Sequence, residues 1–210
     1  GGTRRFFLVH ASYILGLQEG RALPAFRDVY FEHGLATVDL SLKSLMTEPR
    51  SLGHIAAVSH RWKEPGRAFD ESKTQQLRGL LAARTDIELV WIDWSSLPQG
   101  TRGELEEKYF TSVLLGGGGN STSTSCVLSS SILYACLTVV IMVDQKYLSR
   151  FWTQLEAFLA HRVLSAHGLT PAPAKQQESR CLFIEMGASA GTGGLKDVVT
   201  RTWGPISVQE

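Results

Sequence analysis

The apolar run Leu137–Val143 is the feature that most constrains the fold of this chain. Its sequence, LTVVIMV, is rich in β-branched residues and carries no charge, which is typical of a strand covered on both faces. Asp144 ends the run, and from Ser149 onward the apolar residues change to helical spacing. A strand covered on both faces needs helices on either side of its sheet, so this segment favours an α/β fold.

The helix predicted after this strand carries one acid beside its apolar face. Ser149 is its expected N-cap. The apolar face is expected to consist of four residues, Phe151, Leu155, Phe158 and Leu159. Trp152, Glu156 and Ala160 form a neighbouring row at i, i+4 spacing, so we expect Glu156 to stand next to the indole of Trp152 at the top of the sheet. Such a setting can tune the pKa of a carboxylic acid.

Other short apolar runs alternate with helical patterns along the chain. Further strands are predicted at three places, His54–Ser59, Leu89–Trp94 and the CLFIEM segment at 181–186. Further helices are predicted at Ser72–Arg84, Glu104–Leu115 and Leu195–Thr202. This alternation predicts an α/β domain with a mainly parallel central sheet.

The domain organisation follows from the remaining segments. Residues 51–205 are expected to form the α/β domain, and residues 1–50 to pack on it, with a short helix around Pro24–His33 and an extended piece near Leu35–Leu42. The low-complexity stretch at 116–131, GGGGNSTSTSCVLSSS, offers almost nothing to bury. We expect it to be a flexible surface insertion.

Composition excludes several classes of function. Among 210 residues, 21 are basic and 20 acidic, which leaves a formal charge of +1 and no field that would attract nucleic acid or an anionic membrane. The three cysteines, Cys126, Cys136 and Cys181, lack the spacing of a metal site. Cys136 and Cys181 begin apolar runs, where cysteine is usually a small buried hydrophobic residue. A reducing, cytoplasmic location is expected.

Three segments are predicted to meet at one edge of the sheet. Open parallel sheets bind ligands at the carboxyl ends of their strands. That rule selects Ser59–Trp62, Asp93–Gln99 and Asp144–Glu156.

These three segments carry a resemblance to a known family. SHRW at 59–62, WIDWSSLPQ at 91–99 and YLSRFWTQLEAFLA at 147–160 resemble the motifs of heterokaryon-incompatibility (HET) domains, in the same order. HET domains are similar to TIR domains, so the resemblance implies a three-layer flavodoxin-like fold. It also implies a role in defence, self/non-self recognition or cell-death signalling.

The resemblance gives Glu156 a chemical role. In TIR domains that cleave NAD, the glutamate of the corresponding helix holds the nicotinamide ribose, so Glu156 is the candidate catalytic residue and NAD a candidate substrate, with no cofactor. Cleavage builds positive charge on the ribose, which a fixed carboxylate stabilises more in the transition state than in the ground state. The alternative is a structural glutamate that pairs with Arg150 or His161, or faces solvent.

The candidate substrate-binding residues lie around the same edge, and each has a structural alternative. Arg61 either grips a phosphate or carboxylate of a nucleotide ligand or pairs with Asp93 or Glu64. His60 either transfers a proton or makes a structural hydrogen bond. Asp93 is expected to orient Arg61 or His60. The set is completed by Ser59 and three tryptophans, Trp62, Trp94 and Trp152.

The tryptophans and the function itself leave alternatives open. Trp62 and Trp94 either stack on a nucleotide base or cap the core at the ends of strands. The protein is either an NAD glycohydrolase or a non-enzymatic signalling module that acts by homotypic assembly. In the second case the same surfaces would form contacts in a homo-oligomer.

Overall fold

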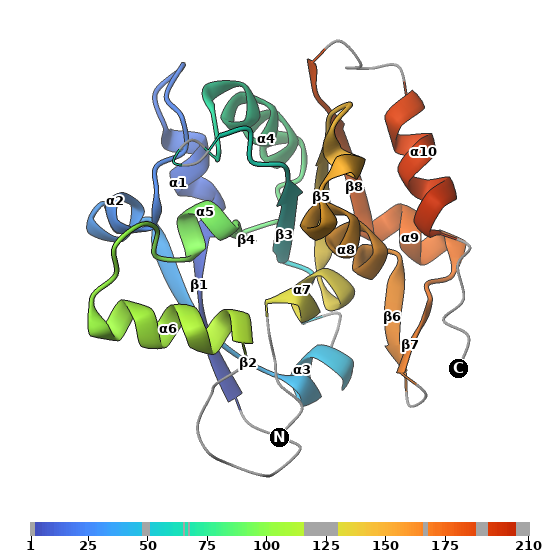
Figure 1. Cartoon of the computed structure of the whole chain (residues 1–210), viewed down its shortest axis with the longest axis horizontal. Coiled ribbons are helices and arrows are strands. Elements are labelled where there is room, and N and C mark those ends of the chain that lie inside the picture. The colour runs from blue at the N-terminus through green and yellow to red at the C-terminus, as the bar shows by residue number, and fades with distance from the viewer. Residues whose placement is uncertain are drawn as a thin grey trace.

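A six-stranded sheet organises the computed structural model, which describes residues 3–47, 51–64, 66, 68–115, 130–165, 168–187 and 193–204. The order across the sheet is β2-β1-β4-β3-β5-β8 (Figure 1). Its strands are β1 (Thr3–His10), β2 (Leu35–Ser41), β3 (Ile55–His60), β4 (Leu89–Trp91), β5 (Thr138–Val143) and β8 (Cys181–Glu185). The neighbours β4, β3, β5 and β8 are parallel, whereas β1 is antiparallel to both β2 and β4. The predicted α/β fold with a mainly parallel sheet is therefore confirmed.

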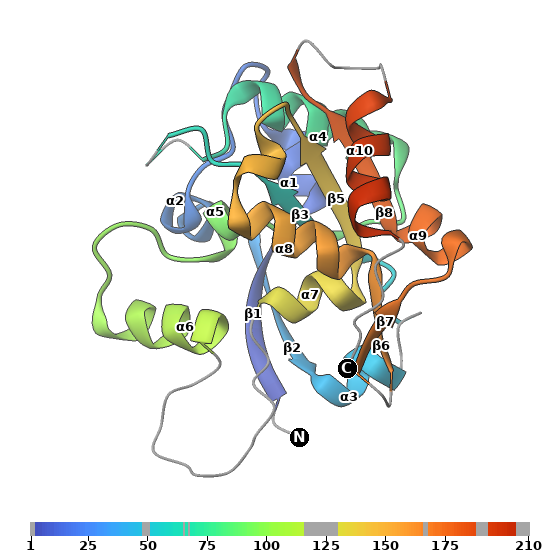
Figure 2. The same ribbon diagram turned by 45° about the vertical axis from the view of Figure 1, so that its right-hand side comes forward.

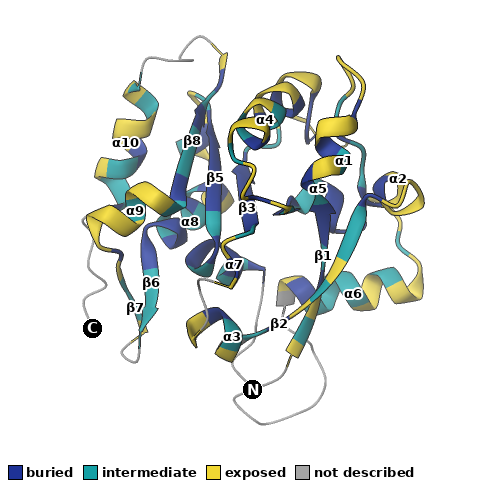
Figure 3. Ribbon diagram, turned by 180° about the vertical axis from the view of Figure 1, so that it is seen from behind, coloured by how far each residue is buried: buried dark blue, intermediate teal, exposed yellow. Residues whose placement is uncertain are grey.

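Helices pack against both faces of the sheet. They are α1 (Ala11–Gly16), α2 (Phe26–Phe31), α3 (Leu42–Thr47), α4 (Glu71–Ala83), α5 (Asp93–Ser96), α6 (Glu104–Leu115), α7 (Ser131–Cys136), α8 (Phe151–Ala160), α9 (Ala174–Arg180) and α10 (Gly194–Trp203). Alternate residues of β5 enter two different cores: Ile141 joins residues of α7 and α8, and Val140 joins residues of α1 and α4. β5 is thus buried on both faces, as its apolar sequence predicts (Figure 3).

The N-terminal residues contribute directly to the sheet. Residues predicted to pack on the domain supply β1 and β2, and Val9 of β1 pairs with Val90 of β4. The helix and the extended piece expected in this region are present as α2 and β2. The low-complexity residues 116–129 lie outside the described part of the chain.

The structure differs from the sequence prediction around α8. Ser149 does not cap this helix: it ends a 3₁₀ turn, η1 (Tyr147–Ser149), and its hydroxyl donates to the Lys146 carbonyl at 2.6 Å. The cap position belongs to Arg150. Phe151, expected on the apolar face, is 69 % exposed. The buried residues of α8 are Thr153, Ala157, Leu159 and Ala160.

A small hairpin follows α8. β6 (Arg162–Ser165) and β7 (Gly168–Pro171) form a separate antiparallel sheet, followed by α9. Among the residues that the structure describes, no helix combines the length and hydropathy needed to cross a bilayer.

Candidate functional site

Ser59 and Glu156 meet at the carboxyl end of β3. The Ser59 hydroxyl, 0 % exposed, donates to Glu156 Oε2 at 2.6 Å and lies 2.5 Å from the hydroxyl of Tyr147. β3 lies between β4 and β5 and is parallel to both, so its end is where the strand order changes direction. α8 lies over β3 and β5 and carries Glu156 to this end (Figure 2).

Glu156 belongs to the buried side of α8. It shares a row with Thr153, Ala157 and Ala160, which are all buried, at i, i+3 and i+4 spacing. The expected alternative partners of Glu156 do not hold it: His161 Nδ1 lies 2.7 Å from the Ala157 carbonyl, and no ion pair joins Glu156 to Arg150 or His161 in the described ranges. Glu156 therefore faces the sheet, not bulk solvent.

The surroundings of Glu156 favour its protonated form. Burial, together with the negative charge of Asp93, raises its pKa to about 8, although the Ser59 and Tyr134 hydroxyls partly oppose the shift. The Glu156 carboxyl therefore stays protonated at neutral pH unless a nearby positive charge stabilises its ionised form.

Two tyrosines complete this site. Tyr134 of α7 is 3 % exposed, its hydroxyl donates to the Val58 carbonyl at 3.3 Å, and the same hydroxyl lies beside the Glu156 carboxyl. Tyr147 of η1 is fully buried, and burial raises the pKa of both phenols well above the usual value. The sequence analysis missed both: Tyr134 belongs to no recognised motif, and Tyr147 lies inside a quoted motif without an assigned role.

His60, Trp62 and Trp94 converge on Asp93, the first residue of α5. His60 Nε2 lies 2.9 Å from Asp93 Oδ1, Trp62 Nε1 donates to Oδ2 at 2.8 Å, and the Trp94 backbone N–H donates to Oδ1 at 2.6 Å. Burial opposes ionisation, yet the hydrogen bonds from His60, Trp62 and the Trp94 backbone keep the Asp93 pKa below its usual value. Of the two residues that Asp93 was expected to orient, Arg61 and His60, the structure places His60 against its carboxylate.

Lys73 sets the hydrogen-bonding pattern of His60. Its ammonium group is buried, donates to the carbonyls of Arg61 and Ala68 at 2.6 Å each, and lies 3.3 Å from His60 Nδ1. An ammonium group only donates, so Nδ1 accepts and the proton sits on Nε2, which donates to Asp93. His60 is therefore a structural hydrogen-bonding residue, and burial lowers the Lys73 pKa to about 8. Sequence reasoning did not select Lys73.

Arg61 is held by Asp144, which was not among its expected partners. Its Nε and Nη2 donate to the Asp144 carboxylate at 2.7–3.1 Å, so it pairs with neither Asp93 nor Glu64. Asp144 is the residue that ends the β5 run and also accepts from the Lys146 backbone N–H. The fork of Arg61 is thus occupied by protein, and the pair ties the end of β3 to the end of β5.

The tryptophans occupy three different settings. Trp62 and Trp94 are half-buried and meet edge to face with centroids 5.6 Å apart, and Trp94 Nε1 donates to the Leu23 carbonyl at 3.0 Å. Trp152 is 68 % exposed and packs on Phe151 at 5.2 Å. The Glu156 carboxyl is consequently flanked by Ser59 and tyrosines, whereas an indole was expected.

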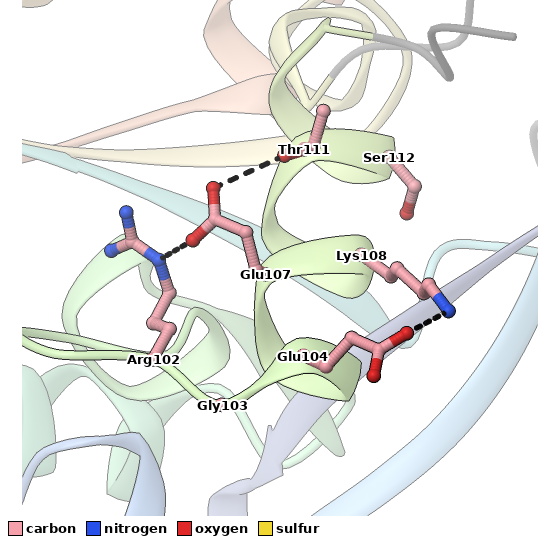
Figure 4. Close-up of a pocket in the computed structure, with 7 residues that line it drawn as sticks. All are labelled: Arg102, Gly103, Glu104, Glu107, Lys108, Thr111 and Ser112. Carbon is pink, nitrogen blue, oxygen red and sulfur yellow. Dashed lines mark hydrogen bonds and ion pairs between the residues drawn. The ribbon is translucent and has the colours of Figure 1, made fainter.

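A surface hollow elsewhere does not coincide with this site. It has a volume of about 520 Å³ and lies along α6 (Figure 4), lined by Arg102, Gly103, Glu104, Glu107, Lys108, Thr111 and Ser112. Arg102 pairs with Glu107 at 2.6 Å and Lys108 with Glu104 at 2.6 Å. Its charged groups are therefore paired with one another, and none is a predicted site residue.

The remaining candidates for chemistry in the described ranges are metal-ligating side chains and cysteine thiols. They contain no group of three or more His, Cys, Asp or Glu side chains placed to hold a metal ion. Cys136 and Cys181 are free thiols, and burial raises the pKa of each to about 11, which leaves little reactive thiolate at neutral pH.

Comparisons with known proteins give no family for the chain. No family model, curated protein or solved structure matches it.

Proposed function

We propose that this chain is a HET/TIR-like domain with a three-layer flavodoxin-like fold that cleaves the nicotinamide glycosidic bond of NAD, with Glu156 as the catalytic residue. The proposed setting is defence, self/non-self recognition or cell-death signalling. The observation that carries the proposal is the hydrogen bond between Ser59 at the end of β3 and Glu156 of α8. It brings two of the three family-like motifs together at the edge where open α/β sheets bind ligands.

The local chemistry suits bond cleavage that generates a cation. The bond between ribose C1′ and the pyridinium nitrogen breaks, its electron pair leaves with neutral nicotinamide, and water adds to C1′ and releases a proton. A cationic nicotinamide ring next to Glu156 would lower the carboxyl pKa and release the proton that the empty site holds. The resulting carboxylate would stabilise the charge that develops on the ribose.

Ser59 and Tyr147 would position that carboxylate. Tyr147 donates to the Ser59 hydroxyl when Ser59 donates to Glu156, so the three groups form a directed chain. Thr153, whose hydroxyl donates to the Tyr147 carbonyl at 2.5 Å, connects η1 to α8. A carboxylate fixed in this way reorganises little during the reaction.

Glu156→Gln tests the catalytic assignment. We expect the purified wild-type protein to release nicotinamide from NAD, and the variant to lose about 100-fold or more in kcat, because glutamine cannot carry the compensating charge. Chromatographic quantification of nicotinamide and ADP-ribose measures both rates. Glu178→Gln, at an exposed glutamate of α9, is the matched control and should retain wild-type turnover. Equal turnover in wild type and Glu156→Gln would falsify the assignment.

The pH dependence of kcat/KM gives a second test. The free protein must lose the Glu156 proton, so kcat/KM should rise about tenfold per pH unit below a pKa of about 8 and level off above it. The kcat profile should bend at lower pH, because bound substrate carries a positive ring beside the carboxyl. A kcat/KM profile that is flat or falls between pH 6 and pH 8 contradicts this role for Glu156.

One observation favours the alternative of homotypic assembly. Phe151 and Trp152 are 69 % and 68 % exposed and contact each other at the start of α8, next to the candidate site. An exposed aromatic pair of this kind suits a protein contact. Under this alternative no nicotinamide is released from NAD at any protein concentration. Sedimentation detects oligomers of the wild-type protein, and these oligomers are absent in Phe151→Ser.

A further inference from the structure

Three buried nitrogens lack hydrogen-bond partners in the described part of the chain. They are Arg162 Nε, Arg162 Nη2 and Trp203 Nε1. Arg162 is 0 % exposed, and its Nη1 donates to the His161 carbonyl at 3.0 Å, so only one edge of the guanidinium is satisfied. Buried donors in folded proteins almost always have partners, and a buried charge without one is especially costly.

The two side chains that carry these donors contact the same aromatic ring. The Arg162 guanidinium carbon lies 4.3 Å from the centroid of Phe158, and the Trp203 ring meets Phe158 edge to face at 5.8 Å. Phe158 belongs to α8, Arg162 begins β6 and Trp203 ends α10, and both α10 and β6 contact α8 (Figure 2). The donors thus come from two elements, β6 and α10, that both contact α8.

The unsatisfied edge has the geometry of an oxyanion receptor. Nε and Nη2 are the two nitrogens whose N–H bonds run parallel, and this is the edge that binds a carboxylate in bidentate fashion. Arg61 uses the same two nitrogens to hold Asp144 in this protein. In the described ranges Arg162 has no such acid, since none of the ion pairs found there involves it.

We infer that Arg162 and Trp203 form a binding site for a small planar carboxylate, with the Arg162 fork holding its two oxygens and the Trp203 indole supplying a third donor. A carboxylate suits the site better than a phosphate for two reasons. A singly charged anion costs less to remove from water than a dianion, and its two coplanar oxygens match the two parallel N–H bonds of the fork. This site is separate from Glu156 and does not depend on the NAD proposal.

Entry requires movement of a neighbouring element, because the Arg162 side chain is covered. α10 is the last described helix and packs on α8 and β8. Of the residues of α10, Val199 is buried, and elements with few buried apolar contacts open most readily. Binding of the carboxylate should therefore stabilise the docked position of α10.

Acetate is the probe that tests this site. Thermal unfolding of the whole chain is followed in sodium acetate and in sodium chloride of equal ionic strength at pH 7. Wild type should gain about 3–5 °C in Tm at acetate tenfold above its dissociation constant, relative to chloride. The gain should vanish in Arg162→Met and in Arg162→Lys, which keeps the charge and loses the fork. Trp203→Phe should weaken acetate binding about fivefold, as expected for one hydrogen bond.

A control and a direct readout make the test decisive. Arg201→Met removes an exposed cation from the same helix as Trp203 and should keep the full acetate effect. The Trp203 indole N–H resonance, assigned by its absence in Trp203→Phe, should shift on titration with acetate. The site is refuted by equal acetate effects in wild type and Arg162→Lys, by an unmoved indole resonance, or by phosphate raising Tm more than acetate.

Discussion

Glu156→Gln is expected to stabilise the fold at alkaline pH by about 5 kcal/mol relative to its effect at pH 4, because the wild-type carboxyl must give up a proton in a buried site. A carboxyl whose pKa is raised on folding contributes fully to stability when both states are protonated, below about pH 4.5. Between about pH 4.5 and pH 8 only the folded state keeps its proton, so wild-type stability falls by about 1.4 kcal/mol per pH unit. Above the folded-state pKa of about 8 the loss is complete. Glutamine has no proton to lose.

Urea unfolding of both proteins at a series of pH values measures this effect. The difference in unfolding free energy between Glu156→Gln and wild type should grow with pH and level off near pH 8. Glu178→Gln removes an exposed acid and should give a curve parallel to that of wild type. A Glu156→Gln curve that also runs parallel would show that folding does not raise the pKa of the carboxyl, and would remove the basis for the pH-dependent activity proposed above.

Asp93→Ala is expected to destabilise the fold by about 2–4 kcal/mol, because it leaves several donors without an acceptor. His60 Nε2, Trp62 Nε1 and the Trp94 backbone N–H all lie within 2.9 Å of its carboxylate oxygens. The His60 side chain is 1 % exposed, so water cannot readily replace the lost partner. Loss of the charge should also lower the Glu156 pKa, since Asp93 is one of the groups that raise it.

Two measurements separate these effects of Asp93. Urea unfolding gives the change in stability, with Asp86→Ala as the control: Asp86 pairs with Arg84 on an exposed surface, and its loss should change stability far less. Carbon-13 NMR of labelled glutamate follows the titration of Glu156 in Asp93→Asn, which keeps an acceptor oxygen and loses the charge. An unchanged Glu156 titration would mean that burial alone sets its pKa.

The sheet was the most predictable part of this protein. Runs such as HIAAVS and LTVVIMV contain too few polar residues to face water, and they form β3 and β5 close to the expected bounds. The edge at which Ser59 and Glu156 meet also followed from the alternation of strands and helices. The hairpin of β6 and β7 was missed because its short, polar strands carry no periodic signal, and tertiary packing holds them in place.

The surroundings of Glu156 were predicted less well for a geometric reason. Trp152 and Glu156 share an i, i+4 row, yet Trp152 is exposed while Glu156 faces the sheet. The rotation of α8 about its axis decides which side is buried, and small residues, Ala157 and Ala160, were the better indicator of close packing. Arg61 and Asp144 lie far apart in sequence, so their pairing depended on the strand order that only the structure provides.

The position of β1 has a consequence for how this domain can be subdivided. β1 is the neighbour that covers the outer edge of β4, a strand of three residues whose Val90 pairs with Val9. A polypeptide that begins at residue 51 would retain the strand ends that carry Ser59 and Asp93, but it would present the unpaired backbone N–H and C=O groups of β4 to other molecules. Exposed edges of this kind recruit further strands. The smallest unit that can be expressed as a well-behaved monomer therefore includes the first strand.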